Sequence, residues 1–539
     1  MSKQSWPEPD TDSTDNSDVE KLTSDQECQG QSPAPKSQPH QEETRYRETG
    51  SSMLYPSVAN SSLHPNTNSA QKHSNFQVCP NWYQGRRRKA ALLLTLIWGG
   101  TIALHFVSWG IWFVLGLTGL LSIHAIRIFS AQTRPLRQTA PKQPPKDWPY
   151  VSLLVAAKNE EAVISNLVKN LCNLDYPSDC YELWVIDDNS SDQTPNVLEK
   201  LTQEYPQLKV LRRSANASGG KSGALNQVLA LTQGEIIGVF DADAQIAPDM
   251  LSHVVPLFNT NKKVGAVQVR KAINNASENF WTRSQATEMA LDAYFQAKRI
   301  TIGGIGELRG NGQFVRREAL LSCGGWNEET ITDDLDLTIR LHLDQWDIEC
   351  LSFPPVYEEG VTNFQALWHQ RNRWAEGGYQ RYLDYWPLII RNRMGTQKTL
   401  DLVCFWITQY MLPTAVIPDL VLSLIQGCLP LTAPLTCFTL TLSLLGMFFG
   451  LRSIRQIQGM MVNVNPELLK NGNRSELGST NSSETLSPFS EKLTLWIDTL
   501  RGTVYMLHWL LVVGSTTARM GIRPKQLKWV KTVHQGNNQ

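Results

Sequence analysis

Apolar segments long enough to cross a bilayer lie on both sides of a long polar region in this chain. Residues 90–130 are apolar almost throughout, and apolar character returns over residues 402–426 and 431–450. A helix needs roughly 20 residues to cross a membrane, so the first stretch fits a hairpin of two spans and each later stretch fits one. The sequence therefore predicts a water-soluble domain inserted between four membrane spans.

The placement of basic residues predicts how these spans are oriented. A basic cluster at residues 86–89 precedes the hairpin, Arg127, Arg134 and Arg137 lie at or beyond its end, and Arg452 follows the last span. Basic residues collect on the cytoplasmic side of membrane proteins. We therefore expect an integral multi-pass protein whose soluble domain lies in the cytoplasm.

Three residues in the 402–426 segment are unusual for a helix that faces lipid. Pro413 and Pro418 each remove a backbone donor, which predicts a kinked span. Asp419 is costly in hydrocarbon, so we expect it to face protein or water.

The two ends of the chain are polar. Residues 1–80 contain too little apolar surface to offset chain entropy, which predicts a disordered tail. Residues 452–539 comprise a polar loop, a short apolar stretch at 503–513 and a basic tail that contains Trp529. The short stretch fits a fifth span, a re-entrant segment or an interfacial helix. We favour the interfacial helix, because the basic tail indicates a cytoplasmic C-terminus.

Residues 148–390 show the pattern of a soluble α/β domain. Apolar runs of β character begin at Tyr150, Tyr181 and Glu235, and helix-like stretches separate them. Alternation of strands and helices predicts a mostly parallel sheet covered on both faces. Ligands of such sheets bind at the carboxyl ends of the strands, and we expect each of four polar motifs to follow a strand end.

Composition excludes some other classes of protein. The chain has 50 basic and 50 acidic residues and a formal net charge of +0, which disfavours a nucleic-acid partner. Its nine cysteines are scattered without a C-x-x-C pair, which disfavours a zinc site or a disulfide framework.

The first polar motif is Asp241-Ala-Asp243, directly after an apolar run. A hard divalent ion such as Mg²⁺, with Mn²⁺ as the alternative, takes one or two carboxylates together with the oxygens of a diphosphate. Asp241 and Asp243 are therefore candidate metal ligands beside a departing nucleoside diphosphate. Alone, an acidic pair in a turn is more often simply solvated.

The second motif, Asp187-Asp188, follows the preceding apolar run in the same way. These carboxylates are candidates to accept hydrogen bonds from a base or ribose, although an Asx turn would use the same residues. Lys221 lies in a glycine-rich stretch that lacks the spacing of a phosphate-binding loop of nucleotide triphosphatases. We keep Lys221 as a candidate contact to the nucleotide.

The third and fourth motifs supply a candidate base and a candidate clamp. Thr332-Asp-Asp334 is followed by a further carboxylate, Asp336, and one of these side chains is suited to deprotonate an acceptor hydroxyl. An acidic helix start is the structural alternative. Gln370, Arg373 and Trp374 share a predicted helix, where the arginine can clamp a diphosphate and the tryptophan can pack against a sugar.

Together these motifs resemble the inverting family-2 glycosyltransferases, which have a GT-A fold and include the cellulose, chitin and hyaluronan synthases. The resemblance covers residues 150–386 and implies a GT-A-type domain inserted between transmembrane helices. It also implies roles for individual residues. Asp187 or Asp188 would contact the uridine of UDP, Asp243 would bind the metal and Asp334 would be the base. Gln370, Arg373 and Trp374 would hold the diphosphate and acceptor end. The acceptor pocket would include Arg309, Gly310 and Asn311.

A closer likeness is to a cyanobacterial subgroup of that family that glucosylates diacylglycerol. It is carried by residues 332–337, 369–378 and 528–532. This likeness implies UDP-glucose as donor, diacylglycerol as acceptor, and residence in a plasma or thylakoid membrane. Four spans also favour a lipid acceptor, because export of a polymer needs a channel built from several spans. A processive polysaccharide synthase remains the alternative, followed by a non-catalytic membrane scaffold.

Overall fold

A computed structural model of the chain describes residues 83–132, 148–464 and 488–522. The predicted N-terminal tail, most of the polar loop that follows the last predicted span, and the basic C-terminal tail lie outside the described residues.

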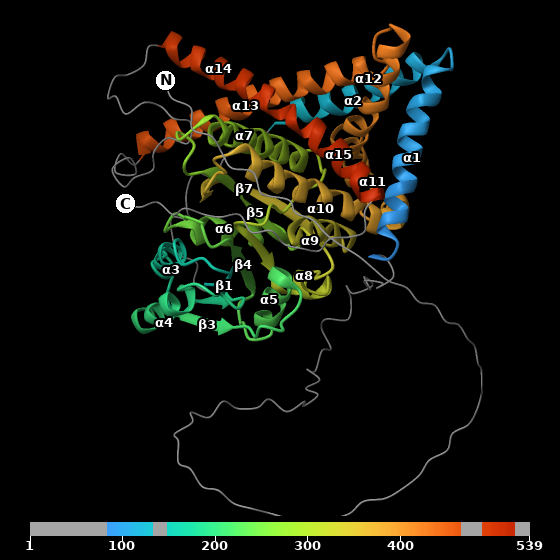
Figure 1. Cartoon of the computed structure of the whole chain (residues 1–539). Helices are drawn as coiled ribbons and strands as arrows, with labels where there is room; N and C mark the ends of the chain where they lie inside the picture. The colour runs from blue at the N-terminus through green and yellow to red at the C-terminus, as the bar shows by residue number, and fades with distance from the viewer. Residues whose placement is uncertain (1–82, 133–147, 465–487, 523–539) are drawn as a thin grey trace, which may run out of the picture. The chain divides into compact units, whose positions relative to one another are not determined.

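The soluble domain is built on a seven-stranded sheet with the strand order β3-β2-β1-β4-β6-β5-β7 (Figure 1). β6 pairs antiparallel with β4 and β5, and the other pairings are parallel, so the predicted mostly parallel α/β sheet is confirmed. The strands are β1 Val151–Ala157, β2 Tyr181–Asp187, β3 Leu208–Arg212, β4 Ile236–Phe240, β5 Val264–Ile273, β6 Gln313–Arg316 and β7 Asp347–Glu358.

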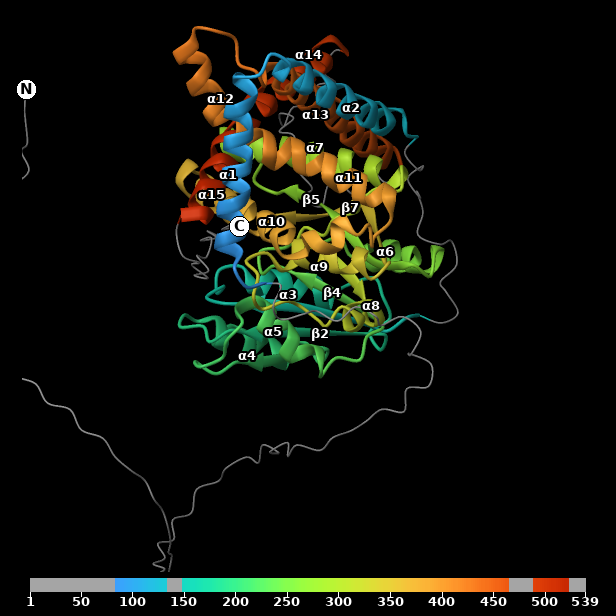
Figure 2. The same cartoon turned by 90° about the vertical axis from the view of Figure 1, so that its right-hand side faces the viewer.

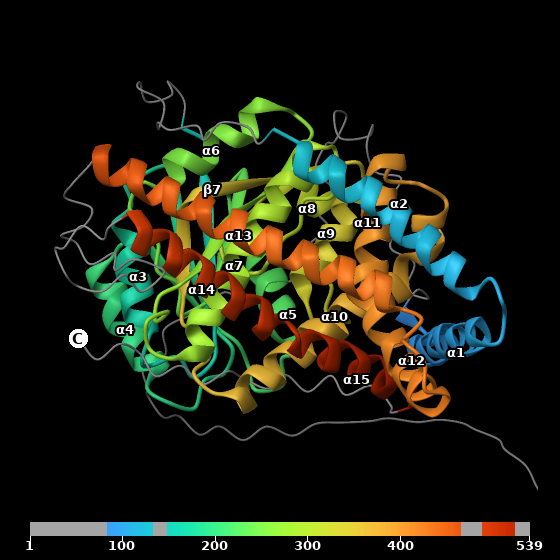
Figure 3. The same cartoon turned by 90° about the horizontal axis from the view of Figure 1, so that it is seen from above.

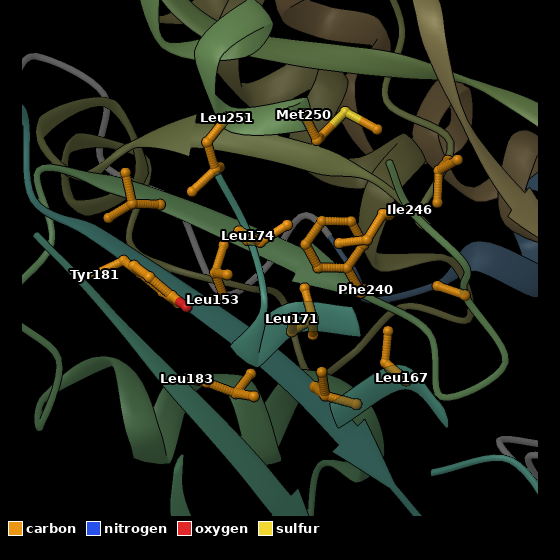
Figure 4. Close-up of a cluster of buried hydrophobic side chains, with 14 of the residues drawn as sticks. Leu153, Leu167, Leu171, Leu174, Tyr181, Leu183, Phe240, Ile246, Met250 and Leu251 are labelled. Atoms are coloured by element: carbon orange, nitrogen blue, oxygen red, sulfur yellow. The ribbon is translucent and has the colours of Figure 1, made fainter. Parts of the chain in front are cut away.

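The central strands are buried on both faces because their sequences are apolar in both alternating positions. In β1, Leu153 packs into one core and its neighbour Leu154 packs into a second core on the opposite face. Figure 4 shows the first core, in which Leu153 and Leu183 lie near Phe240 and the helical side chains Leu171 and Met250. Two buried faces hold the carboxyl ends of β1, β2 and β4 at one edge.

Six helices contribute to these two cores. α3 Ile164–Cys172, α4 Thr194–Glu204 and α6 Met250–Thr260 contribute to the first core. α5 Gly220–Leu229, α8 Arg317–Ser322 and α9 Asp333–Leu343 contribute to the second core.

Two longer helices, α7 Phe280–Thr301 and α10 Phe364–Ile390, connect the sheet with the apolar helices (Figure 1). The Asn279 side chain accepts hydrogen bonds from the amides of Trp281 and Thr282, which fixes the start of α7. The Asn363 side chain accepts a hydrogen bond from the Ala366 amide at the start of α10, and the helix predicted to carry Gln370, Arg373 and Trp374 is confirmed. In Figure 3, α7 lies beneath the helices formed by the apolar segments.

The apolar segments form α1 Arg86–His105, α2 Gly110–Ser130, α11 Thr396–Trp406, α12 Leu412–Gln426 and α13 Ala433–Val464. Among the described residues, three helical segments are long and apolar enough to cross a membrane: Gly110–Ser130, Thr396–Gln426 and Ala433–Met460. α1 is the fourth predicted span, and the basic residues of its first turn lower its mean hydropathy. A π-helical segment, η2 Ile407–Met411, joins α11 to α12, whose second residue, Pro413, cannot donate a backbone hydrogen bond.

α1 and α2 were predicted as a hairpin, but they diverge from a tight corner and do not lie side by side (Figures 2 and 3). A Cβ at Gly110 would lie 2.1 Å from the carbonyl oxygen of Leu104, so the corner requires glycine. α1 packs against α12 and against α15 (His508–Ile522), whereas α2 packs against α13.

The buried carboxylate of Asp419 inside the apolar region has protein partners. Asp419 is completely buried and accepts hydrogen bonds from the amides of Leu431 and Thr432 and from His105 Nε2 at 2.8 Å. The prediction that Asp419 faces protein or water is therefore confirmed. The 503–513 stretch belongs to two helices, α14 Pro488–Met506 and α15 His508–Ile522, and neither is among the three candidate spans.

Candidate active site

One continuous cavity of about 700 Å³ joins the edge of the sheet to the apolar helices. Its polar half, at the ends of β1, β2 and β4, is lined by Lys158, Asp188, Lys221, Asp241, Asp334 and Arg373. Its apolar half, between α2, α7 and α13, is lined by Leu121, Ile128, Met289, Phe295, Phe438 and Leu442. All four sequence motifs therefore contribute to one cavity that extends among the apolar helices.

The expectation that every motif follows a strand end is right for two motifs and wrong for the others. Asp188 follows β2 and Asp241 follows β4. The 332–334 motif instead starts α9, and the 370–374 motif lies in the first half of α10. Helix starts and helix faces therefore complete a site whose floor is the sheet edge.

Asp187 and Asp188 point into different surroundings. Asp187 is 1% exposed, accepts a hydrogen bond from the Ser190 amide and is absent from the cavity lining. Asp188 lines the cavity, where Arg213 Nη1 lies 2.5 Å and Lys158 Nζ lies 3.5 Å from its oxygens. Asp187 thus forms the Asx-type turn, and Asp188 is the residue positioned to meet a ligand.

Lys221 and the Asp241-Ala-Asp243 pair meet at the polar half of the cavity. Lys221 belongs to the first turn of α5, and its Nζ lies 2.5 Å from Asp241 Oδ1. Burial opposes the charge of Lys221, but the carboxylates of Asp241 and Asp333 hold the pKa of Lys221 above its usual value. Asp243 Oδ2 accepts a hydrogen bond from the Glu359 amide at 3.0 Å. These contacts fix both carboxylates at the cavity wall.

The three carboxylates at the start of α9 have different environments. Asp336 is buried and accepts from Arg340 Nε at 2.6 Å and from the Tyr385 hydroxyl at 2.9 Å, so it is held within the protein. Asp333 and Asp334 line the cavity. Burial and the neighbouring charge of Asp333 raise the pKa of Asp334 to about 6.

The motif on α10 presents three side chains to the cavity: Gln370, Arg373 and Trp374. Between them, Arg371 is fully buried and forms an ion pair with Glu288 of α7 at 2.5 Å. The guanidinium carbon of Arg371 lies 4.1 Å from the centroid of the Trp374 ring. Arg371 thus makes a cation–π contact with the Trp374 ring, which helps to hold the ring in position.

The predicted acceptor residues divide into two groups. Arg309 and Gly310 line the cavity, and a Cβ at Gly310 would lie 3.4 Å from Asp334 Oδ2. Asn311 is fully buried outside the lining, and its side-chain oxygen accepts a hydrogen bond from the Asp241 amide at 3.3 Å. The structure therefore places Asn311, two residues before the start of β6, behind the acidic pair and outside the cavity lining.

Several lining residues were not predicted from the sequence. Lys271 on β5 forms an ion pair with Glu358 at 2.9 Å and lies 5.3 Å from the centroid of the Trp374 ring. The apolar half of the cavity was also not predicted, nor was the buried arginine Arg299 that lines it. Charged residues in the α7 sequence were the available signal, because an interrupted apolar pattern marks a helix that faces a polar cavity.

Among the described residues, no three His, Cys, Asp or Glu side chains converge as a complete metal-binding group. Asp241 and Asp243 supply two carboxylates, which suits an ion that takes its remaining ligands from a diphosphate and water. The donor chemistry therefore fits a hard divalent cation that binds together with a nucleotide.

Comparison with known proteins places the chain in a family. Residues 149–377 match the model of "Glycosyltransferase like family 2". The chain is 62% identical over 460 residues to the "Beta-monoglucosyldiacylglycerol synthase" of Trichormus variabilis, covering 85% of this chain and 92% of that protein. It is 55% identical over 454 residues to the protein of the same name from Synechocystis sp., covering 84% and 89%.

Among solved structures, a mannosyltransferase from Pyrobaculum calidifontis in complex with GDP-Man and Mn²⁺ aligns with a TM-score of 0.47 and 20% identity, covering 76% of this chain and 99% of that one. The matched family and the long relatives define a membrane-associated glycosyltransferase. The chain belongs to the family-2 glycosyltransferases, in the group that contains the β-monoglucosyldiacylglycerol synthases.

Proposed function

We propose that this glycosyltransferase transfers glucose from UDP-glucose to the free hydroxyl of diacylglycerol, with inversion at the anomeric carbon. The product is β-monoglucosyldiacylglycerol. The names of relatives that share 62% and 55% of their aligned residues with the chain support this reaction.

The observation that carries the proposal is the continuity of the cavity. Carboxylates and basic side chains line one half, and side chains of two candidate spans, α2 and α13, line the other half. An acceptor with two acyl chains can place those chains among the apolar helices while its hydroxyl reaches the polar half. A water-soluble acceptor would leave the apolar half without a function.

Asp188, Lys221, Arg373 and Gln370 are the proposed donor contacts. Asp188 is held by two basic groups and presents a fixed acceptor for uridine or ribose. Lys221 and Arg373 supply positive charge where the diphosphate leaves. Asp241 keeps the Lys221 ammonium at the cavity wall, so its position is set before the donor binds.

Asp334 is the proposed general base. It lines the cavity, and its raised pKa brings it closer to neutral pH than an ordinary carboxylate, where a base accepts a proton more effectively. The acceptor hydroxyl gives its proton to Asp334 as its oxygen forms a bond to the anomeric carbon. The bond to the UDP oxygen breaks on the opposite face, which inverts the configuration.

Asp241 and Asp243 are the proposed ligands of a divalent cation, Mg²⁺ or Mn²⁺. A bound cation would offset the negative charge that develops on the departing diphosphate. Two hydrogen bonds hold the acidic turn in place. The Asp241 amide donates to the side-chain oxygen of Asn311, and the Glu359 amide donates to Asp243 Oδ2, so the protein contributes fixed carboxylates for this purpose.

We place the catalytic domain on the cytoplasmic surface of a plasma or thylakoid membrane. The basic residues that flank the apolar segments support this orientation. Large apolar side chains exposed on the helices, including Trp112, Phe113, Leu424 and Ile425, support contact with lipid.

Incubation of the purified protein with radiolabelled UDP-sugars and vesicles that contain diacylglycerol tests the proposal. We expect label from UDP-glucose in a lipid that carries one hexose. A long water-soluble polymer would favour the polysaccharide synthase instead. Absence of UDP release with any lipid acceptor would favour a non-catalytic scaffold.

A further inference from the structure

The apolar half of the cavity contains a buried ionic group that the reaction itself does not require. Asp401 of α11 is 1% exposed and accepts hydrogen bonds from Arg299 Nε at 2.9 Å, from the Ile305 amide at 2.9 Å, and from His124 Nε2 at 3.1 Å. Arg299, His124 and Asp401 all line the cavity. Charges are placed among apolar helices only at a cost, so such groups mark sites of function.

Arg299 has a donor that the protein leaves unused. Its Nε bonds Asp401 and its Nη1 lies 3.8 Å from Glu307 Oε1, but its Nη2 has no hydrogen-bond partner and is shielded from solvent. The arginine is 5% exposed, and its guanidinium carbon lies 4.7 Å from the Phe405 ring centroid. A buried donor without a partner is costly, which indicates that a ligand completes it.

A second unused donor lies on α13. The Ser443 hydroxyl lines the cavity, is shielded from solvent and has no partner. Thr439, one turn earlier on the same face, also lines the cavity, but its hydroxyl donates to the Thr436 carbonyl at 2.9 Å. Ser443 therefore differs from its neighbour in having a free donor.

The two donors lie on helices that pack against each other, α7 and α13, and both residues line the cavity. A Cβ at Gly450 would lie 2.5 Å from the Ala290 carbonyl oxygen, and one at Gly446 would lie 2.4 Å from the Phe295 ring. These contacts show that the helices run antiparallel at close approach, as glycines four residues apart allow. If this register continues by one turn, Ser443 is level with the turn of α7 that carries Arg299.

We infer that Arg299 Nη2 and Ser443 Oγ donate hydrogen bonds to the ester carbonyls of a two-chain glycerolipid acceptor. This inference rests on the proposed function and names the part of the acceptor that the enzyme recognises. Diacylglycerol carries two ester carbonyls between its hydroxyl and its acyl chains. Each carbonyl oxygen can accept a hydrogen bond but has no hydrogen to donate. Asp401 and His124 hold the arginine and are positioning residues.

A comparison of ester and ether acceptors tests the inference. Diacylglycerol and the matching dialkylglycerol have the same free hydroxyl and chains, but the dialkyl lipid lacks carbonyl oxygens. With the unaltered enzyme, we expect the KM for the dialkyl lipid to be about tenfold or more above that for the diester, as expected when two donors lose their acceptors. The kcat values should stay similar.

Two variants connect this preference to the named residues. Ser443→Ala should raise the KM for the diester by about fivefold and leave the dialkyl lipid unaffected. Arg299→Lys keeps a positive charge beside Asp401 but lacks the Nη2 donor of the guanidinium, so it should also reduce the preference for the diester over the dialkyl lipid. Thr439→Val, which removes a hydroxyl that is already bonded to the backbone, is the matched control and should keep the full preference.

The outcomes separate the inference from the proposed function. Equal KM values for the two lipids with the unaltered enzyme would overturn the inference and leave glucosyl transfer to lipid intact. Equal loss toward both lipids in Ser443→Ala would also overturn it. No transfer to either lipid would overturn the proposed function and the inference with it.

Discussion

Lys221 Nζ lies 2.5 Å from Asp241 Oδ1, so the first carboxylate of the acidic pair is already bound to a cation of the protein. A metal ion at the proposed acidic pair would share Asp241 with this ammonium. Asp243 Oδ2 accepts a hydrogen bond from the Glu359 amide at 3.0 Å. The Lys221 contact therefore reduces the share of Asp241 in the proposed metal site and supports the proposed role of Lys221 on the diphosphate.

We expect Lys221→Met to raise the KM for UDP-glucose about tenfold or more, because a charged hydrogen bond to the diphosphate is lost. Without nucleotide, the Lys221→Met protein should bind Mn²⁺ more tightly than the unaltered protein, since the Asp241 carboxylate is no longer paired with an ammonium. Initial rates and calorimetric titration measure the two effects. An unchanged KM would contradict the assigned role of Lys221.

Asp243→Asn should reduce activity more than Asp241→Asn does, and a chelator should stop transfer by the unaltered enzyme. The physical reason is that removal of Asp243 leaves only the carboxylate that is shared with Lys221. Activity measured against Mg²⁺ or Mn²⁺ concentration checks the order of the two variants. Full activity without divalent cations would exclude the metal role of the pair.

Asp334→Asn should lower kcat by about 10²-fold to 10⁴-fold, since proton transfer to a positioned base contributes on that scale. UDP-glucose should still bind within a few-fold of its original affinity. Asp336→Asn is not a matched control, because Asp336 is bonded to Arg340 and Tyr385. Turnover retained by Asp334→Asn would exclude its role as base.

The raised pKa of Asp334 predicts the acid limb of the pH profile. A base acts in its ionised form, so kcat/KM should fall about tenfold per unit as the pH drops below about 6. Asp333→Asn removes a negative neighbour that raises this pKa, so the limb should move to lower pH. A limb that stays in place in Asp333→Asn would contradict the coupling of the two carboxylates.

Gly377 couples the helix of the fourth motif to α9, the helix that carries the proposed base Asp334. A Cβ at Gly377 would lie 2.1 Å from Thr332 Oγ1, directly before the start of α9. Gly377→Ala must displace Thr332, at a cost of about 1–3 kcal/mol in unfolding free energy. We expect kcat to fall while UDP-glucose binding is kept, as rates and thermal unfolding would measure. Gly395→Ala does not serve as a control, because its φ of +91° disfavours alanine.

The central strands could be predicted from the sequence because their burial needs apolar residues on both faces. β1, β2 and β4 are therefore plain in the sequence. β7 mixes Asp347, Glu349 and Glu358 into a half-buried strand, and β6 has four residues, so neither shows a clear pattern. β6 lies between β4 and β5, and β7 pairs at the edge of the sheet beside β5, so pairing with neighbouring strands, not local composition, determines them.

The candidate site shows the same division. Motif order predicted which residues meet, and the structure brings most of them to one cavity. The sequence did not separate Asp187 from Asp188, because the choice depends on where β2 ends and which side chain turns inward. Asn311 was misplaced for the same reason. Arg299 and Ser443 lie on different helices, so only the packing of α7 against α13 makes both of them line one cavity.

The anomeric configuration of the glucolipid made from UDP-α-glucose tests most directly whether Asp334 drives an in-line displacement in this cavity. Proton NMR of the purified product distinguishes the two anomers by the coupling of the anomeric proton. We expect only the β-glucoside of diacylglycerol. An α-glucoside would contradict a single displacement with Asp334 as base.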